Sequence, residues 1–384
     1  QPRVMAAFAL SALLLSANWS VYVWAVQNAQ VTYFGPEASV KADAIEQGDG
    51  GKVIVWADGT TRAFGNISAQ GGSGAGHGGF VETSGHHLET NGIRVRTTAA
   101  SGHAGTWLLD PYNVDISSTT ANGGFVSNVF APSGTPSTVS AADIQANLTN
   151  GEVVITTVGL GSDQGSVTVS APISSSSAYS LKLLAEGNLT VNQSVDLTGG
   201  GDLSLVAGWD TTSGTANPST VAGVGTLTLA NSVLAHGSSV FARAGSGIVS
   251  SAGTTRGMFQ GYVYLKSGGT IDAMLDGDFS AVSTGYGSSI TISDPGALRT
   301  MFPGITTNHG NVSLNPTNAG LSLLSGPIDL GSGTLSLHAS GGMNYLADST
   351  ATIRAGGVSL DATTSLGSYN SADLSITTDT LTLP

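Results

Sequence analysis

Four histidines in the first third of the chain are the residues whose type and spacing could first suggest chemistry. They are His77, His86, His87 and His103, which lie close together in the sequence. Zinc-binding chains space their histidines in ordered motifs such as His-Glu-x-x-His, and no such motif occurs here. Neighbouring residues of an extended strand point to opposite faces, so we expect His86 and His87 to lie on different faces. The pattern favours surface or corner histidines and predicts no metal site.

Two other short motifs resemble ligand-binding loops. The glycine run GGSGAGHGG at 71–79 lacks the Lys-Ser/Thr ending of a phosphate-binding loop, and no helical pattern follows it. Asp276 and Asp278 lie in LDGDF, which is too short for a calcium-binding loop. The chain has no cysteine, which excludes thiolate metal sites and cysteine nucleophiles. We therefore interpret the glycine run as a loop between structural repeats.

Charge argues against two classes of function. With 12 basic and 25 acidic residues the formal net charge is −13, so nucleic-acid binding is not expected. Enzymes that cleave acidic polysaccharides align carboxylates with a metal or with basic side chains on one face. The basic residues after residue 151 are few and scattered: Lys182, Arg243, Arg256, Lys266, Arg299 and Arg354. We predict no catalytic, cofactor-binding or metal-binding residues, and a protein that is not an enzyme.

The composition is typical of strands and turns. Glycine accounts for 54 of the 384 residues, and charged residues for only 10%, against roughly a quarter in ordinary domains. Disordered chains are rich in charge and poor in β-branched residues, whereas this chain is rich in Val, Ile and Thr. A surface of Ser, Thr, Asn and Gly suits strands and tight turns. The composition therefore predicts an all-β protein.

Short alternating strands recur at a nearly constant spacing in the second half. The step between the first apolar residues of five successive motifs is almost unchanged from one motif to the next: Ile290, Val312, Leu335, Val358 and Leu381. Similar steps link Leu181 to Leu203, Leu203 to Leu227, Val240 to Val263 and Ile248 to Ile271. An antiparallel sandwich would give alternation without this constant step.

A constant step of about 22–23 residues is typical of stacked coils, each of which buries its apolar residues against the next. We predict that residues 152–384 form a repetitive parallel β-helix of about 10 coils. At about 4.8 Å per stacked strand its length would be roughly 50 Å. Two or three short strands and their corners fit within one coil of this length.

One helix is predicted between two parts of this rod. In VSAADIQANLTNG, Ser140 is a candidate N-cap, Ile144 and Leu148 are apolar, and Asn150-Gly151 is a stop signal. We interpret 117–151 as an inserted connection, with a short external helix over about 140–149. We therefore expect this helix to lie outside the rod.

Both ends of the sequence are unusual. Residues 1–26 include an apolar run, and no charge occurs between Arg3 and Glu37, so this segment is either signal-like or an artefact. The chain begins with Gln1 and ends inside the strand-like DTLTLP, which suggests truncation at the C-terminus.

Residues 27–116 carry three motifs that resemble one protein family. They are GGKVIVWAD at 50–58, GGFVETSG at 78–85 and GTWLLDPYNV at 105–114. This segment is similar to the large exoproteins of bacterial two-partner secretion, the filamentous-haemagglutinin-like proteins and high-molecular-weight adhesins. Their residue types suit packing: alternating Val and Ile for strands, Gly for corners, and Trp107-Leu108-Leu109 for the core.

The resemblance implies a right-handed parallel β-helix, secretion to the bacterial cell surface through an outer-membrane transporter, and attachment to host or bacterial surface glycans or proteins. It implies no catalytic residues, and the family's secretion domain would precede this region. We expect a structural and adhesive rod segment. The alternatives are the stalk of a contact-dependent toxin and a polysaccharide-active β-helix.

Overall fold

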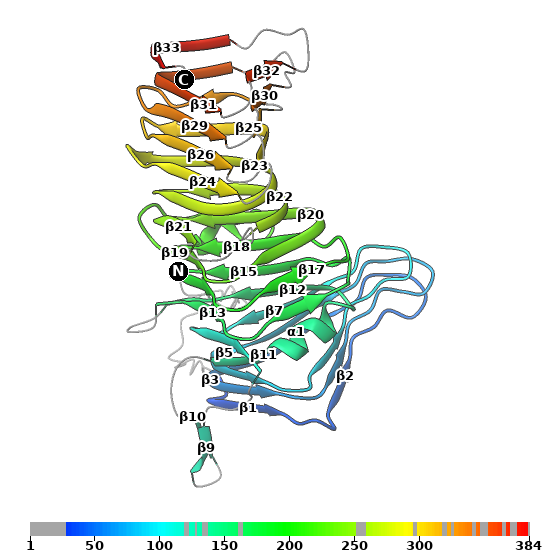
Figure 1. The fold of residues 1–384 in the computed structure, drawn as a ribbon. Coiled ribbons are helices and arrows are strands. Elements are labelled where there is room, and N and C mark those ends of the chain that lie inside the picture. The colour runs from blue at the N-terminus through cyan, green and yellow to red at the C-terminus, as the bar shows by residue number, and fades with distance from the viewer. Residues whose placement is uncertain are drawn as a thin grey trace, which may run out of the picture.

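The computed structural model describes most of the chain from residue 28 onward. The described residues are 28–118, 123–126, 129–132, 137–159, 164–250, 259–294, 298–316, 321–323, 326–339, 343–345, 352–362, 366–368 and 375–382. The predicted signal-like segment 1–26 lies outside them. Within the described residues, 28 strands belong to one continuous sheet that coils upward as a parallel β-helix (Figure 1). The predicted all-β solenoid is therefore confirmed.

The coils present three faces, and the longest strands bend from one face into the next. The first face contains β3 (Lys52–Ala63), β5 (Phe80–Thr90), β7 (Thr106–Asp110), β12 (Glu152–Thr156), β15 (Leu181–Ala185), β18 (Leu203–Ala207), β20 (Val233–Ala244), β22 (Phe259–Ser267), β23 (Ile271–Tyr286), β25 (Leu298–Asn308), β28 (Ile328–Asp329), β31 (Thr352–Ala362) and β33 (Ser375–Thr382). The second face adds β1 (Val31–Phe34), β8 (Val114–Ser117), β11 (Ser137–Ser140), β13 (Val167–Val169), β16 (Leu189–Val191), β19 (Thr226–Leu229), β21 (Gly247–Ser250), β24 (Ile290–Asp294), β26 (Val312–Pro316) and β29 (Thr334–Ala339).

The third face combines short strands with the α-helix. It contains β2 (Ser39–Lys41), β4 (Asn66–Ser68), β6 (Arg94–Arg96), α1 (Ala141–Asn147), β14 (Ile173–Ser175), β17 (Val195–Leu197), β27 (Leu321–Leu323), β30 (Met343–Tyr345) and β32 (Leu366–Ser368). Two further strands, β9 (Gly123–Val126) and β10 (Val129–Pro132), pair with each other as an antiparallel hairpin. A short 3-10 helix, η1, spans Thr211–Ser213.

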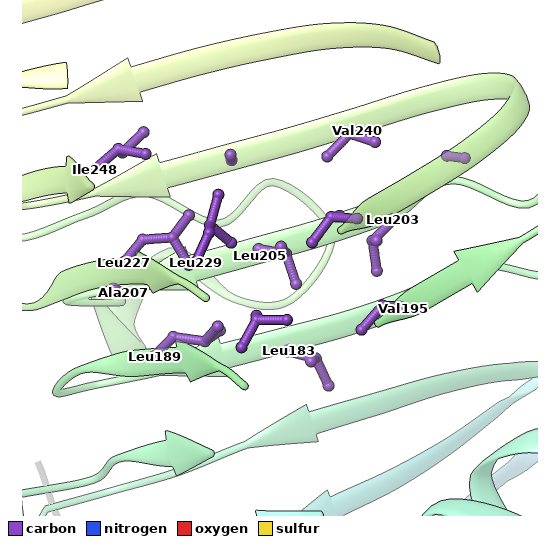
Figure 2. Packing of buried hydrophobic residues seen from close by; sticks show 14 of the residues in the cluster. Leu183, Leu189, Val195, Leu203, Leu205, Ala207, Leu227, Leu229, Val240 and Ile248 are labelled. Carbon is purple, nitrogen blue, oxygen red and sulfur yellow. The ribbon is translucent and has the colours of Figure 1, made fainter. Parts of the chain in front are cut away.

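The predicted row of five residues is confirmed by the strand register. Ile290 pairs with Val312, which pairs with Leu335, and Val358 and Leu381 continue the row. Within the described residues the same row extends downward through six earlier coils, at Val114, Val167, Leu189, Leu227, Ile248 and Ile271. Figure 2 shows Leu189, Leu227 and Ile248 of this row stacked inside the rod.

One predicted step is wrong. Leu203 does not stack on Leu227: Leu203 pairs with Val240, and Leu227 pairs with Leu189. The reason is an insertion at 208–225, which includes η1 and lengthens this coil. The other predicted steps, from Leu181 to Leu203, Val240 to Val263 and Ile248 to Ile271, are confirmed.

Burial of alternate side chains explains why these sequences form strands. In β16, for example, Leu189 and Val191 are buried and Thr190 points outward. The inner residues of successive coils merge into one apolar cluster that runs along the rod. Full burial of a Leu, Val or Ile side chain stabilises the fold by about 1.5–3 kcal/mol. The stacked rows therefore supply the main favourable free energy of the rod.

The glycine run at 71–79 forms a loop, as predicted, and this loop stacks on two neighbouring loops. Three loops, at 42–51, 69–79 and 97–105, project from the first coils (Figure 1). Their backbones are joined by hydrogen bonds such as Gly50 N–H to the His77 carbonyl (2.8 Å) and Gly78 N–H to the His103 carbonyl (2.8 Å). A Cβ atom on Gly78 would lie 1.7 Å from the Thr97 carbonyl oxygen. Glycine is needed here because neighbouring backbones approach too closely for a side chain.

The helix forms where predicted, but the prediction that it lies outside the rod is wrong. Ser140 caps α1 and its hydroxyl accepts the Asp143 N–H. Ile144 and Leu148 are fully buried in the core cluster. The helix packs between β6 and β14 on the third face. It thus occupies the place of a strand in its coil.

Side chains of α1 also satisfy the open edge of the strand below it. The Asn147 amide oxygen accepts the Val95 N–H at 2.8 Å, and its nitrogen donates to the Ile93 carbonyl at 3.2 Å. The Asp143 carboxylate accepts the Gly92 N–H. Burial raises the pKa of Asp143, and the hydrogen bonds from Gly92 and Thr90 oppose this effect. These bonds replace the ladder that a further strand would provide.

The predicted connection 117–151 therefore contributes directly to the rod. Its strand β11 lies between β5 and β8 and pairs in parallel with both. The chain leaves the second face after β8 and returns one level lower as β11, before α1 fills the third face. A coil is thus completed by segments that are not adjacent in the sequence.

We predict that Gly78→Ala lowers the free energy of unfolding by about 1–3 kcal/mol, because the new methyl group would overlap the Thr97 carbonyl. The control is Gly74→Ala in the same loop. Its Cβ would lie 3.1 Å from the nearest atom, the backbone carbonyl oxygen of Glu46. It should change stability by less than about 1 kcal/mol. Urea denaturation followed by circular dichroism measures both. Equal effects of the two substitutions would contradict the stacked-loop packing.

We also predict that Ile144→Ala destabilises the protein by about 2–5 kcal/mol, because it leaves a cavity between the helix and the core. The exposed Thr149 provides the control, and Thr149→Ala should change stability by no more than about 0.5 kcal/mol. The midpoints of urea unfolding report the difference. A stability of Ile144→Ala equal to that of the unaltered chain would place the helix outside the core after all.

Candidate functional site

The histidines lie in two separate pairs. His77 and His103 belong to the stacked glycine loops, where their rings are 5.3 Å apart and nearly parallel. The backbone N–H of His103 donates to Nδ1 of the His77 ring at 3.0 Å. The backbone N–H of His77 donates to the Asp49 carboxylate at 2.7 Å. These contacts connect successive loops, so this pair has a structural role.

The prediction that His86 and His87 point to opposite faces is wrong. Their rings stack at 4.6 Å, and His86 also packs at 4.1 Å against Tyr112. β5 passes from the first face to the second at this point, because residues 80–84 pair with β7 and residues 89–90 pair with β11. The alternation of faces is lost at this corner. Nowhere in the described residues do three or more His, Asp or Glu side chains gather as metal ligands would.

The other sequence candidates also have structural partners. Trp107 and Leu109 fill the core as expected, and the Trp107 indole N–H donates to the Thr83 hydroxyl at 3.1 Å. Leu108 is also buried, but it belongs to a second cluster on the outer side of the first face. Asp278 forms an ion pair with Arg299 at 2.6 Å. None of these contacts indicates a catalytic arrangement.

A group of aromatic side chains on the first face is the best candidate for a functional surface. We call Phe241, Tyr262 and Tyr264 the aromatic platform. Phe241 and Tyr264 occupy equivalent outward positions of β20 and β22, one coil apart. Their rings stack with centroids 5.0 Å apart and planes 10° from parallel. Tyr262 lies two residues before Tyr264 and is 50% exposed.

Two cations border the aromatic platform at the next outward position. Arg243 pairs in register with Lys266, two residues beyond Phe241 and Tyr264 respectively. Arg243 donates to the Pro218 carbonyl at 2.7 Å, and its guanidinium lies 5.8 Å from the Phe241 ring centroid. Burial lowers the pKa of Arg243. Lys266 is exposed.

The insertion at 208–225 flanks this surface. Pro218 belongs to it, and Trp209 from the same insertion is buried against Leu184 and Val206 of the outer apolar cluster. The coil that carries the insertion is therefore the one whose strand β20 begins the aromatic platform. The insertion thus contacts Arg243, which borders the half-buried ring of Phe241.

The chemistry of the aromatic platform is that of binding. Ring faces offer large apolar contact areas with polar hydroxyls at their ends, and such residues dominate the energetics of recognition surfaces. The arrangement can therefore hold a partner through contacts with its rings.

The aromatic platform was not predicted from the sequence, although a signal exists. YVYLK at 262–266 places two tyrosines two residues apart, which puts both on one face of a strand. Phe241 precedes Tyr264 by one full step of the repeat, the same step that separates Val240 from Val263. Combining the two periodicities would have brought the three rings together.

No protein-family model matches the chain, and no curated protein is significantly similar to it. Among the described helices, none combines the length and the hydropathy that a bilayer crossing requires.

Proposed function

We propose that this chain is a structural and adhesive rod segment of a large secreted bacterial surface protein. The main support is the uninterrupted inner row, which stacks coil on coil from Val114 to Leu381. Such a row makes a long, stiff body from a repeated unit and fills its interior. Length and rigidity are the properties that a protein needs to hold a contact surface away from a cell.

The aromatic platform is the proposed contact surface. Its rings project from the outer side of the rod, where a host or bacterial surface glycan or protein could pack against them. One patch of this size would bind weakly. Display of many copies on a cell surface would raise the overall avidity without any new contact.

The family resemblance of residues 27–116 supports the secreted location. It favours export through an outer-membrane transporter of two-partner secretion, and the absence of cysteine is consistent with a chain that crosses membranes unfolded. The same rod would serve equally as the stalk of a contact-dependent toxin. That alternative assigns the activity to another domain and leaves the role of the rod unchanged.

An enzyme acting on acidic polysaccharides is the least favoured alternative. The cations of the later rod are mostly engaged in structural contacts: Arg299 with Asp278, Arg354 with Asp329, and Arg243 with Pro218. A polyanion would also approach a protein of net charge −13. We therefore expect no turnover of pectin or alginate by the purified chain.

The test is adhesion of beads coated with the purified chain to epithelial and bacterial cells. We predict that Tyr262→Ala with Tyr264→Ala reduces the number of bound cells roughly tenfold, because each aromatic anchor at an interface typically contributes more than about 1 kcal/mol. The control is Tyr286→Ala, which removes an 81% exposed tyrosine elsewhere on the rod. Circular dichroism verifies that the variants are folded.

Three outcomes would contradict parts of this proposal. Equal adhesion by the platform variant and the Tyr286 control would remove the platform as the contact surface. Failure of the unaltered chain to adhere would favour the passive stalk of a toxin. Cleavage of pectin or alginate that disappears when one carboxylate is changed would make the protein an enzyme.

A further inference from the structure

The third face of the first coils holds a basic groove that the proposed function does not use. The groove has a volume of about 200 Å³ and lies across β2, β4 and β6, where these strands lead into the projecting glycine loops. The residues that matter for its chemistry are Lys41, Asp43, Asn66, Ser68, Arg94 and Arg96. Three are cations and one is a carboxylate, so the groove carries a formal charge of +2 in a chain of net charge −13.

The strand register brings these side chains together. Lys41, Ser68 and Arg96 occupy the same position on three successive strands, and Asn66 and Arg94 occupy the position two residues earlier. Between these polar residues, Ile67 and Val95 are buried, whereas Val40 on the first of the three strands is 37% exposed. With strands about 4.8 Å apart, Lys41 and Arg96 stand roughly 10 Å apart on either side of Ser68. Both side chains are long enough to reach a ligand held above Ser68.

Two of the three cations lack an anionic partner among the described residues. Neither Lys41 nor Arg96 forms an ion pair or a side-chain hydrogen bond in the part of the chain that the structure describes. Arg94 donates to the Ile93 carbonyl at 3.1 Å and lies 4.0 Å from Asp143. Most other described cations are engaged: Arg62 with Glu89, Lys182 with Glu152, Arg299 with Asp278, and Arg354 with Asp329.

One oxygen of the only carboxylate among the lining residues, Oδ1 of Asp43, accepts two hydrogen bonds. Asp43 accepts hydrogen bonds from the Ser68 hydroxyl at 2.5 Å and from the Gln70 N–H at 2.8 Å. These bonds connect Asp43 to the neighbouring strand β4 and to Gln70, just beyond the end of that strand. Among the described contacts, Asp43 forms no ion pair with Lys41 or Arg96. The Ser68 hydroxyl therefore lines the groove, but its proton is already donated to Asp43. The remaining donors are the Lys41 ammonium, the two guanidinium groups and the Asn66 amide.

We propose that the basic groove is a binding site for a compact tetrahedral oxyanion of the phosphate or sulfate class. A guanidinium group presents paired donors that match two oxygens of such an anion, and Lys41 adds a point charge from the opposite side. The Asn66 amide provides a neutral donor between them. A planar monocarboxylate offers only two oxygens and cannot reach donors on both sides of the groove. This site is separate from the aromatic platform and does not depend on the proposed adhesive function.

The test is isothermal titration calorimetry of the full chain with inorganic phosphate, sulfate and acetate at low ionic strength. We expect phosphate and sulfate to bind with a dissociation constant on the order of millimolar, and acetate at least roughly tenfold more weakly. Arg96→Gln should weaken phosphate binding roughly tenfold. The matched control is Lys266→Gln, which removes an exposed cation outside the groove and changes the net charge equally.

A second experiment tests whether the groove takes a free inorganic anion or an ester group on a larger molecule. Competition between inorganic phosphate and a sulfated monosaccharide distinguishes a site for the free ion from one for an ester group, and displacement by either supports the groove. Equal weakening by Arg96→Gln and Lys266→Gln would overturn the proposal, because binding would then reflect net charge alone. Equal binding of acetate and phosphate, or binding of neither, would also overturn it. Unchanged circular dichroism shows that both exposed-site variants remain folded.

Discussion

Stacking of one apolar residue directly above another, coil after coil, is the constraint on which the rest of this structure depends. A single coil has too few apolar residues to form a core, so each inner side chain is buried only when the next coil repeats its position. The row that contains Leu189, Leu227 and Ile248 shows how strictly this holds. Residues can be inserted between rows, but a row that loses register exposes its inner face to water.

That constraint explains the unusual features of the first coils. The glycine loops stack because the strands they join are stacked, and their backbones then approach so closely that a Cβ on Gly78 would overlap Thr97. Where the third face lacks a strand, α1 supplies both the apolar side chain of Ile144 and hydrogen bonds to the strand below. The fold tolerates a helix there because the helix satisfies the same two requirements as a strand.

The aromatic platform and the basic groove follow from the same register. Side chains that point outward are free to vary, yet stacking brings those of neighbouring coils within about 5 Å of each other. Phe241 and Tyr264 stack because they share one position on neighbouring coils, and Lys41 and Arg96 lie on either side of Ser68 for the same reason. Binding surfaces on such a rod are thus assembled from residues one or more coils apart.

Much of the fold could be predicted because a constant step between apolar residues reports the coil directly, as the row from Ile290 to Leu381 confirms. Where an insertion changes the coil length, spacing alone misleads: Leu203 and Leu227 are separated by a plausible repeat length but lie in different rows. The amphipathic pattern of α1 predicted a helix without indicating which surface it covers. The bend after Gly85 brought His86 and His87 together against the rule of alternation.

The two candidate surfaces could not be predicted from single strands. Their members look ordinary until the register is known, because YVYLK and the Arg94-Val95-Arg96 segment each read as one more alternating strand. In the basic groove, Lys41 and Arg96 are far apart in the sequence, and only two successive strand pairings place them on the same groove. Coil length, loop insertions and strand register together determine which outward residues are neighbours.

The distance between two spin labels on the outer side of the second face tests the stacked-coil account most directly. The natural chain has no cysteine, so Thr190→Cys paired with Ser336→Cys, or with Ser359→Cys, can be labelled specifically. Thr190 and Ser336 are separated by six register steps, and Ser359 lies one step further. We predict mean separations of about 29 Å and about 34 Å, because each step adds about 4.8 Å. Equal separations for the two pairs, or a shorter one for Ser359, would contradict the rod.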